Sequence, residues 1–308
     1  MNEKFQNSSQ YILLWIILYG VETFAIFLGN SFAIVVFWKR RFHSRKTSVV
    51  LINLSVADLM VGVSAVEDII SYTCLLSKAS CGKDWTTKYF ILGEFSGCAS
   101  ISFLVLVSLE RLYAMVWPFR SRTTSSRTYM IVVGIVWLLS AAAPASALLS
   151  KSSEILPVEV YEWFGSVIMI ACLLTVSCAY ALIWSYSKRK DPRLSQNNHK
   201  RNKNLAKTLF IVTVLSLITW LPFAVVFNFS SIIKSSSVIN RVTRCLQLGN
   251  SFINPIVYTL RMPVFRQIVK NMFLKAKTTR LNVHQRKTCP RTDAIVLAAF
   301  FNLNNTFK

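Results

Sequence analysis

The amino-acid sequence predicts an all-α membrane protein, a seven-transmembrane helix bundle with a short amphipathic eighth helix. Its 308 residues are 53% hydrophobic and only 16% charged, with a mean hydropathy of +0.45. This composition is too apolar for a soluble domain. Seven apolar stretches are each near or above the roughly 20 residues that a bilayer requires. The segments between them leave no room for a second folded domain.

The apolar stretches predict the transmembrane elements in order. They cover residues 11–38, 48–74, 87–116, 128–149, 162–187, 205–233 and 240–260. We therefore expect four regions along the chain. These are a short extracellular N-terminus at 1–10, the bundle at 11–260, an amphipathic interfacial helix at 261–275 and a basic cytoplasmic tail at 276–308.

Basic residues predict the orientation. Of the 35 Lys and Arg residues, 27 lie on one side: in the segments after the first, third and fifth stretches, at the adjoining ends of the third and sixth stretches, and in the tail. Since cytoplasmic loops carry this excess, the N-terminus is expected outside the cell, where Asn7 begins a glycosylation sequon. The net charge of +22 then indicates attraction to anionic membrane lipid. Nucleic-acid binding is not expected, because no basic patch lies on a soluble fold.

The eighth helix is expected from a periodic pattern after the last stretch. Apolar residues recur at helical spacing with basic residues between them, which is typical of a helix lying in the membrane interface. These apolar residues are Val264, Phe265, Ile268, Val269, Met272 and Phe273.

The last stretch contains a polar break at Asn254-Pro255. Proline removes a backbone donor, and an amide in hydrocarbon must find partners on neighbouring helices. Polar groups at this depth indicate a functional site. The alternative is a simple helix kink.

Short polar motifs occur in the stretches, in order along the chain. Their joint occurrence resembles rhodopsin-like (class A) G-protein-coupled receptors over about residues 11–275. The motifs are Gly29-Asn30, Asn53-Leu54-Ser55-Val56-Ala57-Asp58-Leu59, Glu110-Arg111-Leu112-Tyr113, Trp137, Thr219-Trp220-Leu221-Pro222, and Asn250-Ser251 before Asn254-Pro255-Ile256-Val257-Tyr258.

The resemblance implies a plasma-membrane receptor that binds an extracellular small molecule or peptide within the bundle. It implies activation of a heterotrimeric G-protein by outward movement of span six, with arrestin as a further partner. No enzyme activity is expected, since His43, His199 and His284 are far apart in sequence. The alternative is a non-signalling decoy receptor of the same fold, because Leu112, Ser216 and Asn202 depart from the family pattern.

Asp58 is a carboxylate near mid-membrane, where an unpaired charge costs at least ~2.5 kcal/mol. Ser100, Asn250 and Asn254 are the oxygen-bearing residues that could surround it. The resemblance implies a sodium ion at this position and no other cofactor. The alternative is a protonated Asp58 that is hydrogen-bonded to water and to Asn254.

The resemblance also implies an activation switch. Arg111 pairs with Glu110 at rest and contacts the G-protein when span six moves. Phe119 docks on the G-protein, with lipid contact as the alternative. Tyr180 and Tyr258 approach each other in the active state.

An acidic residue at the foot of span six often restrains this arginine. Asn202 stands at that position, and Leu112 replaces the usual tyrosine after the arginine. We therefore expect raised ligand-free signalling.

Trp220 and Pro222 suggest a kinked sixth helix with the indole below a ligand cavity; the alternative is ordinary core packing. Ser216 stands where the family usually has phenylalanine, and Cys172 replaces the usual proline of span five.

The ligand is constrained by four positions. Gly93 replaces the aspartate that binds amines, and Leu248 replaces the lysine that binds retinal. Asp68 and Glu94 would attract a cationic ligand group if both faced one cavity. Alternatively, Glu67 or Asp68 caps span two in interfacial water.

Cysteine usage departs from the family. Thr86 stands at the span-three position of the usual disulfide. Cys74, Cys81 and Cys245 could instead form one outer bridge. This loss, with the short second outer loop and the missing span-five proline, resembles the melanocortin, adenosine and cannabinoid branch.

Overall fold

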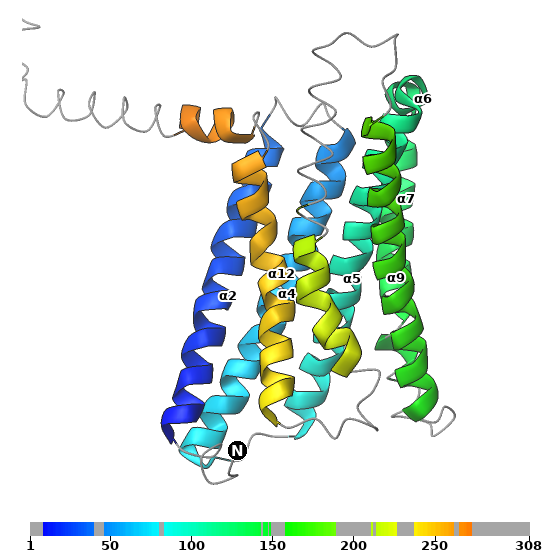
Figure 1. Ribbon diagram of the computed structural model, residues 1–308. Coiled ribbons are helices and arrows are strands. Elements are labelled where there is room, and N and C mark those ends of the chain that lie inside the picture. The colour runs from blue at the N-terminus through cyan, green and yellow to red at the C-terminus, as the bar shows by residue number, and fades with distance from the viewer. Residues whose placement is uncertain are drawn as a thin grey trace, which may run out of the picture. The chain divides into compact units, whose positions relative to one another are not determined.

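The computed structural model describes residues 9–39, 46–79, 83–142, 144–146, 148, 158–188, 211, 214–226, 237–261 and 265–272. This part of the chain contains helices and no strand. The labelled helices of Figure 1 are α2 (Ser9–Trp38), α4 (Lys46–Ser77), α5 (Lys83–Val116), α6 (Pro118–Thr123), α7 (Ser126–Ser140), α9 (Val158–Lys188) and α12 (Ser237–Arg261). A shorter apolar helix, Val214–Val226, lies between α9 and α12 in the sequence.

Five of the described helices are long and apolar enough to cross a membrane. They include all of α2, which matches the predicted span 11–38 closely. The other four membrane-length segments are Thr47–Ser77, Ile91–Val116, Ser126–Ser146 and Gly165–Lys188.

The last helix, α12, is less apolar because one of its faces is polar and buried. Its exposed positions carry apolar side chains such as Val242, Ile256 and Leu260. This arrangement suits a membrane helix whose polar groups find partners inside the bundle. The buried polar residues of α12 are Thr243, Gln247, Asn250, Ser251 and Asn254.

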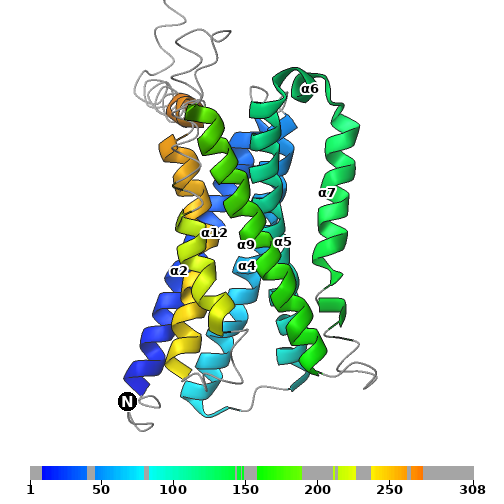
Figure 2. The same cartoon turned by 45° about the vertical axis from the view of Figure 1, so that its right-hand side comes forward.

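The helices pack side by side (Figures 1 and 2). α2 packs on α4 and α12, α4 packs on α5 and α7, and α5 packs on α7 and α9. Figure 2 shows α7 at the edge of the bundle. The indole Nε1 of Trp137 in α7 donates a 2.9 Å hydrogen bond to Asn53 Oδ1 in α4. This hydrogen bond joins α7 to α4, and it gives the polar atoms of the motif residues Trp137 and Asn53 a partner.

The Gly29-Asn30 pair allows α2 to approach α12 closely. A Cβ atom on Gly29 would lie only 3.0 Å from Cγ of Pro255. Asn30 is fully buried, and its Nδ2 donates to the Ser251 carbonyl oxygen at 3.0 Å. Glycine therefore provides the space at which the proline of α12 packs, and the asparagine satisfies a nearby backbone carbonyl.

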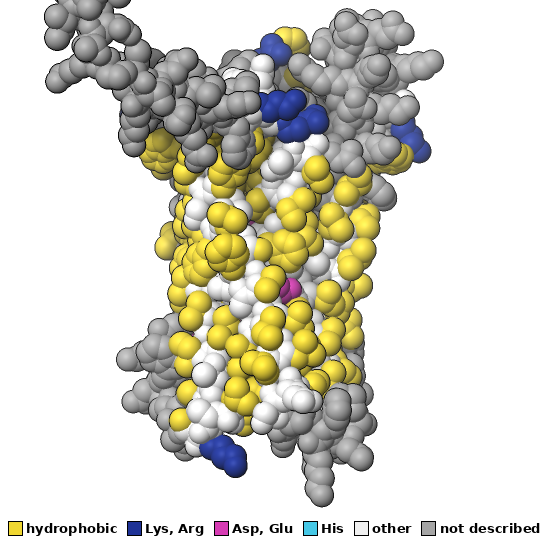
Figure 3. Space-filling model, turned by 90° about the vertical axis from the view of Figure 1, so that its left-hand side faces the viewer, with side chains coloured by type: hydrophobic (Ala, Val, Ile, Leu, Met, Phe, Trp, Pro, Cys, Tyr) yellow, Lys and Arg dark blue, Asp and Glu magenta, His cyan; other side chains and the backbone are white. Residues whose placement is uncertain are grey.

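The surface of the bundle is apolar along its middle. Figure 3 shows hydrophobic side chains covering this part of one face, with the described Lys and Arg residues near its two ends. Phe24 and Leu28 of α2 and Leu138 of α7 are 68%, 62% and 75% exposed. Such a surface suits contact with lipid rather than water.

Residues from Met262 onward form a separate compact unit, in which residues 265–272 are helical. This helix lies within the interfacial helix predicted at 261–275. Predicted features that fall outside the described residues include the sequon at Asn7, Asn202 at the foot of span six, and the basic tail 276–308.

Candidate functional site

Asp58 is the centre of a fully buried polar cluster that joins three helices. Its carboxylate accepts hydrogen bonds from Ser100 Oγ at 2.7 Å, Ser251 Oγ at 2.8 Å and Asn254 Nδ2 at 2.8 Å. The donors come from α5 and α12, whereas Asp58 belongs to α4. Burial of the carboxylate is therefore compensated by direct hydrogen bonds from protein groups.

The structure changes one expected member of this cluster. Ser251 contacts Asp58, whereas the Oδ1 atom of the predicted Asn250 lies 3.5 Å from Thr219 Oγ1. Asn250 is also buried, and its Nδ2 has no hydrogen-bond partner in the part of the chain that the structure describes. The cluster still offers a carboxylate, two hydroxyls and an amide oxygen, which are the oxygen ligands that hard cations take. These residues therefore fit a sodium ion chemically.

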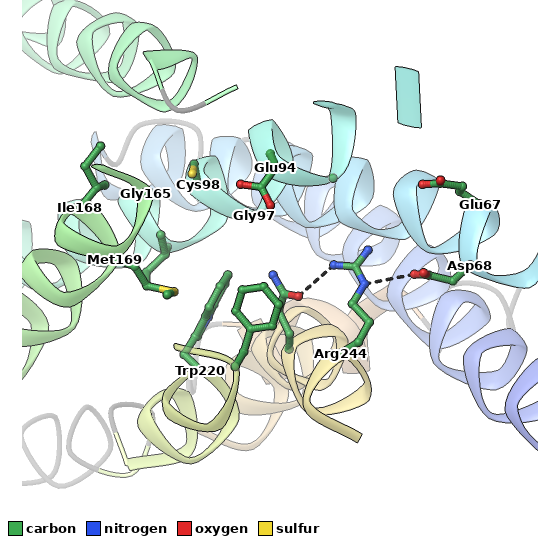
Figure 4. Close-up of a pocket in the computed structure, with 14 residues that line it drawn as sticks. Glu67, Asp68, Glu94, Gly97, Cys98, Gly165, Ile168, Met169, Trp220 and Arg244 are labelled. Atoms are coloured by element: carbon green, nitrogen blue, oxygen red, sulfur yellow. Dashed lines mark hydrogen bonds and ion pairs between the residues drawn. The ribbon is translucent and has the colours of Figure 1, made fainter. Parts of the chain in front are cut away.

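A cavity of about 350 Å³ lies among α4, α5, α9, the helix Val214–Val226 and α12. This volume is within the range of small-ligand pockets. Its two sides differ in character (Figure 4). The apolar side includes Ile101, Ile168, Met169, Trp220 and Phe223. The charged side contains Glu67, Asp68, Glu94 and Arg244.

All three residues predicted to bind a ligand line this one cavity. Asp68 and Glu94 come from α4 and α5, and Trp220 comes from the helix Val214–Val226. The condition for a cationic site, that both carboxylates face the same cavity, is thus met. The carboxylate of Asp68, however, already has a partner.

That partner is Arg244 of α12, which the sequence reasoning missed. Its Nε donates to Asp68 Oδ2 at 3.1 Å, its Nη1 to Gln247 Oε1 at 2.9 Å and its Nη2 to Ser64 Oγ at 3.2 Å. Helical spacing could have revealed it, because positions 244, 247, 251 and 254 recur on one face of α12. An arginine on that face must lie inside the bundle.

Trp220 lies at the boundary between the cavity and an apolar cluster. It is only 4% exposed, and it packs with Met169 and Leu173 of α9 and with Ile101 of α5. Its indole Nε1 is buried and has no hydrogen-bond partner among the described residues. The contacts that the structure gives this ring are therefore packing contacts. Pro222 lies within the same helix.

Glu110 and Arg111 lie at the end of α5 that is distant from the cavity. Arg111 Nε is 3.5 Å from Glu110 Oε2, and Thr47 Oγ1 of α4 donates to Glu110 Oε1 at 2.8 Å. The side chain of Arg111 is 27% exposed, so it is accessible at this end of the bundle. Phe119, on the short helix α6, is 81% exposed.

The two predicted switch tyrosines are buried. Tyr180 packs in a cluster with Ile183, and Leu112 contacts that cluster. The leucine that replaces the usual tyrosine therefore contributes to α5–α9 packing. Tyr258 packs edge-on against Phe37 of α2, with ring centroids 5.3 Å apart.

The structure decides part of the predicted pairing among the outer cysteines. Cys74 is in a disulfide, and its partner lies outside the described residues, as does Cys81. Cys245 is a free thiol that donates to Glu22 Oε1 at 3.1 Å. Cys245 is therefore excluded from the bridge.

An interior cavity, a buried polar cluster and a distant ion pair between Arg111 and Glu110 lie in one bundle of apolar helices, which is the architecture of a multi-pass membrane protein. The chain belongs to the rhodopsin family of seven-transmembrane receptors, since the family model described as "7 transmembrane receptor (rhodopsin family)" matches residues 29–258. This confirms the predicted fold and the predicted receptor class, which is not an enzyme class.

The relatives of the chain include several receptors named for peptides. It is 22% identical over 310 residues to the QRFP-like peptide receptor of Branchiostoma floridae, covering 88% of this chain and 80% of that one. It is 25% identical over 285 residues to galanin receptor type 1 of Mus musculus, covering 80% and 77%.

A third relative is neuropeptide Y receptor type 2 of Sus scrofa, which is 26% identical over 274 residues, covering 79% of this chain and 70% of that one. These three relatives are peptide receptors and do not support the expected melanocortin, adenosine and cannabinoid branch specifically.

Proposed function

We propose that this chain is a plasma-membrane receptor that binds an extracellular peptide in the cavity and activates a heterotrimeric G-protein. The names of the QRFP-like, galanin and neuropeptide Y receptors support a peptide ligand. The mixed apolar and charged lining of the cavity supports it too, because peptides carry both kinds of group. In this proposal the N-terminus faces outside, as the distribution of basic residues favours.

One observation carries the proposal: α5 takes part in all three sites. Glu94 lines the cavity, Ser100 donates to Asp58, and Arg111 lies in the distant switch. Glu94 and Arg111 are separated by about 25 Å along the helix axis, at 1.5 Å per residue. One rigid element therefore connects ligand binding to the G-protein side.

In the proposed mechanism, a ligand repacks the ring of Trp220 against α5 and α9. A ligand that binds one conformation of the receptor more tightly than the other shifts the equilibrium toward the conformation that it prefers. Pro222, in the same helix, would allow outward movement of span six. Arg111 would then leave Glu110 and contact the G-protein.

The other predicted switch residues would complete the inner surface. Tyr180 and Tyr258 would shape the opened inner cavity, while Phe119 on α6 would dock on the G-protein. Arrestin would use the same surface, and inner-leaflet lipid would contact the basic segments beside it.

Sodium binding at the Asp58 cluster is part of the proposal. Asp58, Ser100, Ser251 and the Asn254 amide oxygen would hold the ion, which would supply positive charge to the buried carboxylate. The protein groups alone already satisfy Asp58, so the ion would strengthen the cluster and favour the resting arrangement.

Ligand-free signalling tests the proposal. Cyclic AMP and inositol phosphate are measured in cells that express the intact chain, Arg111→Ala or Arg127→Ala at matched surface levels. We expect a basal signal that Arg111→Ala abolishes and that the control Arg127→Ala, an exposed arginine at the start of α7, retains.

A decoy receptor would give a different pattern in this assay and in a peptide screen. It would show no signal above empty vector in any variant. It would also fail to recruit arrestin when the cells are screened against a peptide library. That combined result would exclude G-protein activation by this chain.

A further inference from the structure

The charged side of the cavity presents a cation as well as carboxylates. Arg244 lines the cavity, and its side chain is 21% exposed. A guanidinium has five N–H donors, and the bonds to Asp68, Gln247 and Ser64 use three of them. Within the part of the chain that the structure describes, two N–H groups are therefore left for a ligand.

The neighbouring helix leaves space for this guanidinium. A Cβ atom on Gly93 of α5 would lie 3.7 Å from Ser64 Cβ and 4.0 Å from Arg244 Nη2. A longer side chain at position 93 would reach the guanidinium directly. Because the residue is glycine, position 93 itself places no side chain against Arg244; the carboxylate that α5 contributes to this side of the cavity is that of Glu94.

The ion pair also changes what Asp68 can do. Arg244 Nε lies 3.1 Å from Asp68 Oδ2, and the side chains are 21% and 29% exposed. A ligand amine would have to displace a cation that is covalently attached and already positioned. Tethering gives Arg244 a high effective concentration at Asp68. A free amine is therefore at a disadvantage at this carboxylate.

We propose that Arg244 determines ligand specificity by binding an acidic group of the ligand, such as a peptide carboxylate. Arginine suits this role because its planar N–H groups match the two oxygens of a carboxylate. Asp68 and Gln247 orient the guanidinium. The ligand's aromatic or aliphatic part would then contact Trp220, Phe223 and Met169 on the apolar side. This inference rests on the proposed function in that it uses the same cavity.

Two small probes of equal size test the proposal. N-acetylphenylalanine carries a carboxylate and an aromatic ring, and N-acetylphenylalanine amide replaces only the carboxylate with a neutral group. Each is titrated against the purified full chain, and the thermal unfolding midpoint is recorded. We expect the acid to stabilise the wild type with an apparent Kd at least tenfold lower than that of the amide.

Variants assign this preference to Arg244. Arg244→Gln is expected to lose the preference for the acid, whereas Arg241→Gln, which removes an α12 arginine that does not line the cavity, keeps it. Asp68→Asn retains Arg244 and removes its counter-charge, so the acid should bind at least as tightly. Should Arg244→Gln fail to fold, Arg244→Lys retains the charge without the planar donors, and the preference should fall several-fold.

An equal response of the wild type to both probes, including no response to either, would overturn the proposal. An undiminished preference for the acid in Arg244→Gln or Arg244→Lys would overturn it as well. Neither result depends on signalling. Failure of this inference is therefore distinguishable from failure of G-protein coupling, which the Arg111→Ala assay detects.

Discussion

Arg244 of α12 donates its Nε–H to Asp68 of α4 at 3.1 Å, across 176 positions of sequence. Asn254 donates to Asp58 between the same two helices at 2.8 Å. The two aspartates are ten residues apart, as are Arg244 and Asn254, which is about 15 Å along a helix. α4 and α12 are therefore joined at two levels, one beside the cavity and one at the buried polar cluster.

The connection between Arg244 and Asp68 should be measurable as an energetic coupling. We expect Arg244→Gln and Asp68→Asn each to lower the thermal stability of the purified chain, because each leaves a partly buried charge without its partner. The double variant should lose less than the sum of the two, with a coupling of about 1 kcal/mol or more. Additive losses would show that the two side chains act independently.

Close packing of α2 on α12 predicts that Gly29 tolerates no side chain. In Gly29→Ala the new Cβ would meet Pro255 Cγ at 3.0 Å, so we expect lower surface expression and a lower unfolding midpoint. Gly20→Ala is a matched control in the same helix, since no heavy atom of the described residues lies within 4 Å of its Cβ position. Alanine at residue 20 should be neutral or stabilising by up to ~1 kcal/mol. Equal behaviour of the two variants would contradict the packing argument.

Sodium binding at Asp58 predicts a salt-specific stability. Replacing NaCl with choline chloride at constant ionic strength should lower the unfolding midpoint of the wild type, because the ion stabilises only the folded state. An ion concentration one hundred times its Kd would contribute about 2.7 kcal/mol. Asp58→Asn should remove the difference between the two salts. An unfolding midpoint of the wild type that is the same in both salts would contradict sodium binding. The Asp58 carboxylate would then be stabilised by the hydrogen bonds from Ser100, Ser251 and Asn254.

The missing acidic restraint predicts raised basal signalling. Asn202→Glu should lower the ligand-free signal by introducing a carboxylate at the foot of span six, where it could hold Arg111 inward. Asn202→Gln is the matched neutral control and should leave the signal unchanged. Cyclic AMP and inositol phosphate at equal surface expression provide the measurement. A basal signal that is insensitive to Asn202→Glu would mean that Glu110 alone restrains Arg111.

Hydropathy predicted the bundle well because membrane spans need long apolar runs whatever their neighbours are. The predicted span 48–74 lies within α4, Lys46–Ser77, and the predicted span 87–116 lies within α5, Lys83–Val116. The sequence also singled out Asp68, Glu94 and Trp220, which line one cavity although they come from three different helices. Ligand binding by these residues stays a prediction. Local hydropathy and the order of the motifs along the chain are enough to predict the helices and to single out candidate residues.

Sequence alone could not decide which partners meet between helices. Asn250 and Ser251 are adjacent, and a helical step of about 100° separates their directions, so the rotation of α12 determines which one contacts Asp58. The sequence likewise shows that Asp68 and Arg244 are present, but it does not show that their side chains lie close together. The long apolar stretches and ordered polar motifs determined a seven-helix receptor. Only the packing of α4, α5 and α12 decided that Arg244 pairs with Asp68, because burial forces each charge to the nearest partner that the fold provides.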